Sequence, residues 1–161
     1  MIAELMDGGT ASHILVGVGP GSFTGIRVAI AAAHGLAIGW GAELRGMSSL
    51  ALLASGANSD GPIAAAVLGG HGELFVQQFD GALNPVSDLR NATPSAAAAL
   101  INAELVVGSG ARQLVAARGW GEARELWPSA SNALLLPEAQ RNLAPRPLYA
   151  RAPDARVPEA A

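Results

Sequence analysis

Short apolar runs separated by glycine-rich turns divide the first third of the chain into alternating strands and helices. Ile14–Val18 is brief and continuously apolar, as expected for a buried strand. A turn at 19–25 leads into a predicted helix from about Thr24 to Ile38. A short strand at Glu43–Gly46 and a helix at Ser48–Ser55, capped by Ser48 or Ser49, come next. Met1–Met6 is predicted to be the end of an amphipathic helix that Gly8 and Gly9 terminate.

A polar, glycine-rich linker at 56–61 separates this part from one with a different pattern. Ile63–Leu68 is a continuous apolar strand, and Glu73–Phe79 alternates as a half-exposed strand does, with a hairpin turn at 69–72 between them. The other predicted elements are a strand at Asn84–Leu89, a helix at Pro94–Ile101 capped by Thr93, a strand at Leu105–Val107 and a helix at Ala111–Arg118.

The order β-β-β-α-β-α in the second part is that of the ribonuclease-H-like unit of actin, hexokinases and sugar kinases. The first part has the order α-β-α, which is the rear of the same unit. We therefore expect an α/β, actin/Hsp70-like double domain. Its parts are the rear of a first domain at 1–57, a second domain at 58–130, and a C-terminal helix and tail at 131–161 that pack back on the first domain. The first unit lacks its leading three strands, about 40–50 residues, so we expect the chain to begin inside a domain.

Composition excludes several classes of protein. The 161 residues are 50% hydrophobic and 14% charged, which excludes a disordered chain, and the lack of cysteine excludes disulfides and thiolate metal sites. A net charge of −3 disfavours a nucleic-acid-binding surface of the chain's own. The longest apolar stretch, Ile26–Trp40, contains Arg27 and His34 and is short for a bilayer, so we expect a cytoplasmic protein without a membrane segment.

The glycine-rich turn is the most specific segment. Its members are Gly19, Pro20, Gly21, Ser22, Phe23, Thr24 and Gly25, and Arg27 follows in the helix. Backbone N–H groups at a helix N-terminus attract anions, and Arg27 would strengthen that field. The spacing fits neither a Walker A loop nor a G-x-G-x-x-G fingerprint. Three interpretations stay open: a tight turn that relieves backbone sterics, an anion site, and a partner-contact surface.

Small residues recur every four positions along the following helix, at Gly25, Ala29, Ala33 and Ala37. Such a smooth face lets another helix approach closely, and much of the remaining circumference is apolar too. Either the chain covers all of it internally, or a partner chain covers one side. If a partner covers that side, the residues that it would contact are Gly25, Ile26, Ala29, Ile30, Ala33 and Ala37.

Several of these segments resemble the TsaB (YeaZ) family. The likeness is strong from Val16 to Ile30 (VGVGPGSFTGIRVAI), in His34-Gly-Leu-Ala and in Gly46-Met-Ser-Ser-Leu, and looser in Gly72–Phe75 and Pro147–Asp154. Two features depart from the family pattern: the opening hairpin with an Asp-Thr-Ser-like segment is missing, and Leu68-Gly-Gly-His stands where Asp-Ala-Arg is usual.

The resemblance implies a function. Members of this peptidase M22-like family are non-catalytic subunits in the synthesis of threonylcarbamoyladenosine (t6A) on tRNA. They form a heterodimer with a TsaD-like transferase through a helical bundle that includes the helix after the glycine turn, and a TsaE-like ATPase joins the pair. ATP, threonylcarbamoyl-adenylate and the TsaD-like partner's metal belong to the complex, so we expect no cofactor in this chain. We expect contact with tRNA only through the complex, and self-association of the isolated chain stays open.

Side chains for catalysis are sparse. His13, His34 and His71 have no second histidine or carboxylate at helical spacing, so no metal site is expected. Glu73 is the one carboxylate in a recognisable motif, and a structural role at the base of the hairpin is the plainer interpretation. The alternative function is a small ATP- or phosphate-binding enzyme of the actin-like class that uses the glycine turn and Arg27.

Overall fold

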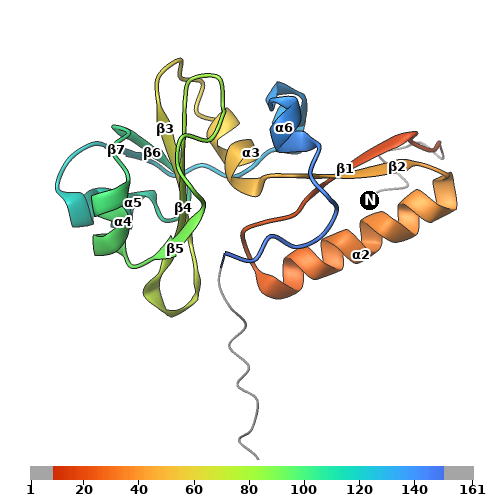
Figure 1. Cartoon of the computed structure of the whole chain (residues 1–161), viewed down its shortest axis with the longest axis horizontal. Helices are drawn as coiled ribbons and strands as arrows, with labels where there is room; N and C mark the ends of the chain where they lie inside the picture. The colour runs from red at the N-terminus through yellow and green to blue at the C-terminus, as the bar shows by residue number, and fades with distance from the viewer. Residues whose placement is uncertain (1–8, 151–161) are drawn as a thin grey trace, which may run out of the picture.

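Two separate β-sheets, with a buried helix between them, organise the chain in the computed structural model, which describes residues 9–150 (Figure 1). The smaller sheet pairs β1 (His13–Gly17) with β2 (Glu43–Met47) in parallel, and α2 (Phe23–Trp40) connects them. The helix between the sheets is α3 (Ser49–Ser55), whose N-cap Ser48 accepts a hydrogen bond from the Ala51 N–H. The helix end expected at Met1–Met6 lies outside the described residues.

The larger sheet has five strands in the order β5-β4-β3-β6-β7. Its strands are β3 (Ile63–Leu68), β4 (Leu74–Phe79), β5 (Arg90–Ala92), β6 (Leu105–Val107) and β7 (Glu122–Arg124). Strands β3, β4 and β5 form an antiparallel meander, whereas β6 and β7 run parallel to β3. The helices α4 (Pro94–Leu100) and α5 (Ala111–Arg118) make the two crossovers. This topology is the ribonuclease-H-like unit, and the expected α/β actin/Hsp70-like class is confirmed.

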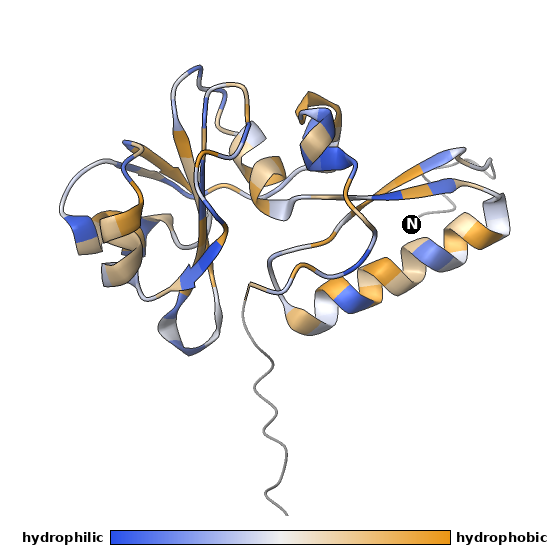
Figure 2. Cartoon of the chain, viewed as in Figure 1, coloured by the Kyte–Doolittle hydropathy of each residue, from blue (hydrophilic) through white to orange (hydrophobic). Residues whose placement is uncertain are grey.

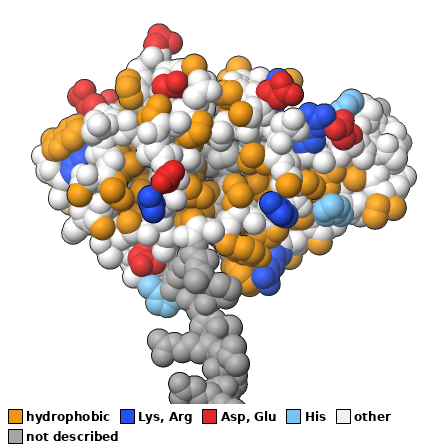
Figure 3. All heavy atoms as spheres, viewed as in Figure 1, with side chains coloured by type: hydrophobic (Ala, Val, Ile, Leu, Met, Phe, Trp, Pro, Cys, Tyr) orange, Lys and Arg blue, Asp and Glu red, His pale blue; other side chains and the backbone are white. Residues whose placement is uncertain are grey.

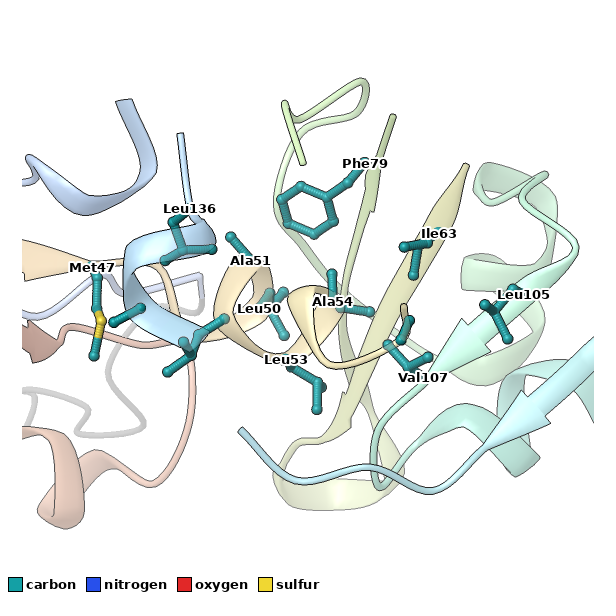
Figure 4. Packing of buried hydrophobic residues seen from close by; sticks show 14 residues of the cluster. Met47, Leu50, Ala51, Leu53, Ala54, Ile63, Phe79, Leu105, Val107 and Leu136 are labelled. Carbon is teal, nitrogen blue, oxygen red and sulfur yellow. The ribbon is translucent and has the colours of Figure 1, made fainter. Parts of the chain in front are cut away.

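Alternating residues of β3 divide the core into two layers. Ile63 and Ala65 face α3, while Ala64 and Ala66 face α4 and α5. Figure 4 shows the first layer, in which α3 lies between Met47 of the smaller sheet and Phe79 and Val107 of the larger one, with Leu50 and Leu53 in the same cluster. Because both faces of β3 are covered, its sequence is a continuous apolar run without polar alternation.

Two strands differ from the sequence-based expectation. The third strand of the meander lies at Arg90–Ala92 and not at Asn84–Leu89, which instead forms most of the connection after β4. Pro85 lacks an N–H and makes only an isolated bridge to Phe79. The edge strand β7 was not expected, since its sequence Glu-Ala-Arg carries no apolar run. The turn at 69–72 contains a 3₁₀ helix at Gly70–Gly72.

The C-terminal segment returns to the smaller sheet. After a 3₁₀ helix at Ala130–Leu135 and α6 (Glu138–Arg141), Leu143 exchanges two backbone hydrogen bonds with Gly46 of β2. The N–H of Leu148 then donates to the carbonyl of Val18. Leu143 and Leu148 also pack on the small core of this half, so residues 143–149 form a strap across the sheet end. The part of the tail from 151 onwards lies outside the described residues.

Candidate partner-binding surface

Helix α2 is positioned by its caps and by one apolar face. The Ser22 hydroxyl accepts from the Gly25 N–H at the start, and Gly41 ends the helix in the left-handed conformation at φ 66°. Ile30 and Ala33 are 7% and 6% exposed, because they pack against Val16 and Val18 behind the glycine turn.

The expected partner-binding set is only partly at the surface. Ile30 and Ala33 lie in the core of the chain's own small sheet, and Ile26 is half-buried against the same core. Gly25 and Ala29 are exposed, and Ala37 is half-buried at the edge of the contact. Of the small residues at 25, 29, 33 and 37, only Ala33 is buried where α2 approaches its own sheet.

A second series of small residues faces outward. With 100° per residue, Ala31, Gly35 and Gly39 fall on the side of α2 opposite Ile30 and Ala33. A Cβ atom added at Gly35 or Gly39 would meet no atom within 4 Å, and both glycines are exposed. This i, i+4 spacing is visible in the sequence, but the sequence does not show which of the two series packs on the sheet.

Large apolar side chains flank that series. Val28 is 62% and Ile38 84% exposed. Figure 2 shows hydrophobic residues along most of α2, interrupted by two hydrophilic positions. Among residues 9–150, α2 is the one helix long and apolar enough to cross a membrane by length and composition, with only 11% of it buried. An apolar helix face of this kind, left open to water, is typical of an interaction surface. We call Val28, Ala31, Gly35, Ile38 and Gly39 the outer face of α2.

Some polar groups of the glycine turn are hydrogen-bonded within the chain. The Gly19 N–H donates to Ser49 Oγ at 3.2 Å, and the Ser49 N–H donates back to the Gly19 carbonyl at 3.0 Å. Gly19 has φ +107°, and a Cβ there would lie 3.3 Å from the Leu148 carbonyl oxygen, so the turn and the strap require glycine. The peptide bond to Pro20 is cis. The Ser22 hydroxyl accepts from the Gly25 N–H, and the Ser22 carbonyl accepts from the Ile26 N–H. The start of α2 therefore keeps fewer free N–H donors for an anion.

Arg27 contacts both Phe23 of the glycine turn and Tyr149 of the strap. Its guanidinium carbon lies 3.7 Å from the centre of the Phe23 ring and 5.7 Å from that of Tyr149, and its Nε donates to the Tyr149 hydroxyl at 2.9 Å. Phe23 and Tyr149 are themselves 5.8 Å apart between ring centres. Figure 3 shows hydrophobic and basic side chains gathered where α2 begins. We call Phe23, Arg27 and Tyr149 the clasp. No sequence signal joins Arg27 to a tyrosine 122 positions away.

The other sequence candidates have structural partners. Asn91 Nδ2 donates to Glu73 Oε2 at the base of the hairpin, and Asn91 Oδ1 is buried with no hydrogen-bond partner. Asp80 accepts bonds from the Ala82 and Asn84 N–H groups, and the backbone bond from Asn84 contributes most to lowering its pKa. Among residues 9–150, no three His, Asp or Glu side chains are grouped to hold a metal ion.

An open cleft of about 400 Å³ lies at the other end of the molecule, where β3, β6 and β7 begin, and none of the glycine turn lines it. Glu122 and Arg124 on its wall pair with each other, and the hydrogen bond from Arg124 lowers the pKa of Glu122.

The two-sheet topology and the buried connecting helix define an α/β protein of the actin/Hsp70 class. The family model described as TsaD, tRNA N6-adenosine threonylcarbamoyltransferase, matches residues 7–105, and the chain belongs to this family, among its TsaB (YeaZ) members.

Solved structures agree with that assignment. A Pseudomonas aeruginosa protein described as uncharacterised, with similarity to peptidase YeaZ, is 26% identical with a TM-score of 0.77, over 94% of this chain and 81% of that one. YeaZ from Pseudomonas aeruginosa is 24% identical with a TM-score of 0.76, over 92% and 81%, and shows the same fold. Comparison with curated proteins gives no match.

Proposed function

We propose that the protein is a non-catalytic subunit of the machinery that makes threonylcarbamoyladenosine on tRNA, and that it binds a TsaD-like transferase through the outer face of α2. The observation that carries the proposal is the exposed apolar face of an 18-residue helix whose opposite side is already packed. Family membership supplies the class of partner.

The geometry of the outer face suits a helix. Ala31, Gly35 and Gly39 are one turn apart, so they present little more than backbone, while Val28 and Ile38 supply apolar side chains on either side. A second helix could approach this series closely and cover the flanking side chains, which removes apolar area from water. A TsaE-like ATPase and the tRNA would then meet this chain only within the complex.

The enzymatic alternative has less support. An ATP- or phosphate-binding role needs free N–H groups in the glycine turn and an available Arg27. Gly19 and Gly25 donate to serine side chains, and Arg27 binds Tyr149. Micromolar binding of ATP to the isolated chain, measured by calorimetry and lost in Arg27→Ala, would favour the enzyme over the scaffold.

Co-expression with a TsaD-family protein from the same genome tests the scaffold role. The wild-type chain should co-purify with it, and Gly35→Leu should abolish the complex because leucine blocks close approach. The isolated Gly35→Leu protein should remain folded, since nothing lies within 4 Å of the new Cβ. Ala117→Leu, at an exposed position of α5 in the other half, is the matched control and should bind normally. Wild-type binding to lipid vesicles in place of the transferase would contradict the proposal.

A further inference from the structure

Arg27 carries a charge that no carboxylate neutralises within the described part of the chain. Arg45, Arg90, Arg112 and Arg124 each lie within 4 Å of a glutamate or aspartate oxygen. The partners of Arg27 are instead the two rings and the hydroxyl of the clasp. Among residues 9–150, Arg27 donates a hydrogen bond only through its Nε. Its two terminal nitrogens therefore keep their N–H groups for another acceptor.

The clasp fixes the direction of that charge. A guanidinium stacked on one ring and bonded to the hydroxyl of another loses its rotamer freedom before a ligand arrives. Phe23 and Tyr149 are 50% and 52% exposed, so the assembly stands at the surface. Its outer edge is therefore a preorganised pair of donors with apolar surroundings, the arrangement that binds a planar carboxylate in two hydrogen bonds.

Arg27 also lies at the edge of the outer face of α2, next to Val28 in sequence. It is the one formally charged side chain between Asp7 and Glu43, so an acidic group that approaches this helix meets no carboxylate of α2. The surrounding apolar side chains exclude water when covered, which strengthens an ion pair at the rim.

Resting on the proposed function, we propose that Arg27, held by Phe23 and Tyr149, is the specificity-determining charge of the partner surface and binds a carboxylate side chain of the docked protein. The outer face of α2 supplies close packing, and Arg27 selects partners whose docking helix carries an aspartate or glutamate at its edge. Tyr149 acts as a positioning residue, so the strap takes part in recognition.

A nucleic acid is the competing ligand for an arginine beside two rings. Three observations favour the carboxylate. The guanidinium already covers a face of Phe23 at 3.7 Å, which takes that face from a base. The clasp is continuous with an apolar helix face and not with a basic groove, and the chain's net charge is −3.

The test measures the dissociation constant of the full chain for its TsaD-family partner at two salt concentrations. Arg27→Gln should weaken binding about tenfold or more and should flatten its dependence on salt. Tyr149→Phe keeps the ring but removes the acceptor for Nε, and it should weaken binding about two- to fivefold. Arg90→Gln, which removes the same charge from edge strand β5, is the control and should bind as the wild type does.

The outcomes separate this inference from the proposed function. If wild type binds, Gly35→Leu does not, and Arg27→Gln binds within twofold of wild type, the inference is wrong and the scaffold role stands. If Arg27→Gln weakens binding without changing its salt dependence, Arg27 acts only through the fold of the strap, which also overturns the inference. Loss of affinity for tRNA alone, measured by fluorescence anisotropy, would identify the nucleic acid as the ligand. If the wild type binds no TsaD-family protein, the proposed function itself fails.

Discussion

Replacement of Gly35 by alanine should stabilise the isolated protein. Glycine in an exposed helix interior costs about 1 kcal/mol relative to alanine, because the unfolded chain gives up more backbone freedom on folding. At Gly35 no atom lies within 4 Å of the added Cβ, so no clash offsets the gain. We expect the free energy of unfolding to rise by about 0.5–1 kcal/mol, which corresponds to an increase in Tm of about 1–4 °C for a chain of this length.

Urea unfolding followed by circular dichroism measures this change, with an unaltered m-value showing that the same surface is exposed on unfolding. Gly41→Ala is the control of opposite sign. Gly41 also has nothing within 4 Å of an added Cβ, but its φ of 66° disfavours alanine, so this variant should lose about 1 kcal/mol. If Gly35→Ala lowers stability, the outer face of α2 is not open to solvent and is not available to a partner.

Three further predictions concern the core, the strap and pH. Ala33→Leu should destabilise the isolated chain by about 1–3 kcal/mol, since it overpacks the contact of α2 with its own sheet; an unchanged Tm would show that Ala33 faces outward after all. Tyr149→Ala should raise the hydrogen-exchange rate of the Leu148 amide, which bonds to Val18, while amides of β6 keep their protection; equal protection in both proteins would contradict a role for the clasp in holding the strap. The lowered pKa of Asp80 contributes stability that is fully present above about pH 4 and is lost as pH falls through the folded-state pKa, so wild type should lose stability on acidification more steeply than Asp80→Asn. If the Tm of both proteins falls equally between pH 5 and pH 3, this role of Asp80 is refuted.

Much of the fold follows from local pattern. The apolar run at Ile63–Leu68 predicts β3, whose first four residues are buried from both sides, and Ser48 and Thr93 cap the helices that follow them. The polar edge strand β7 gave no such signal, because a strand at the edge of a sheet needs backbone partners more than apolar side chains. Periodicity therefore predicts buried strands well and edge strands poorly.

The surface of α2 shows the limit of the same reasoning. Two series of small residues share the spacing i, i+4, so the sequence alone determined that α2 has smooth faces. Only the tertiary structure decided that Ala33 faces the sheet and Gly35 faces outward, because burial depends on which side of the helix meets Val16 and Val18. The contact between Arg27 and Tyr149 is likewise visible only in the tertiary structure. It joins residues 122 positions apart, so it arises from the return path of the chain and not from any local preference.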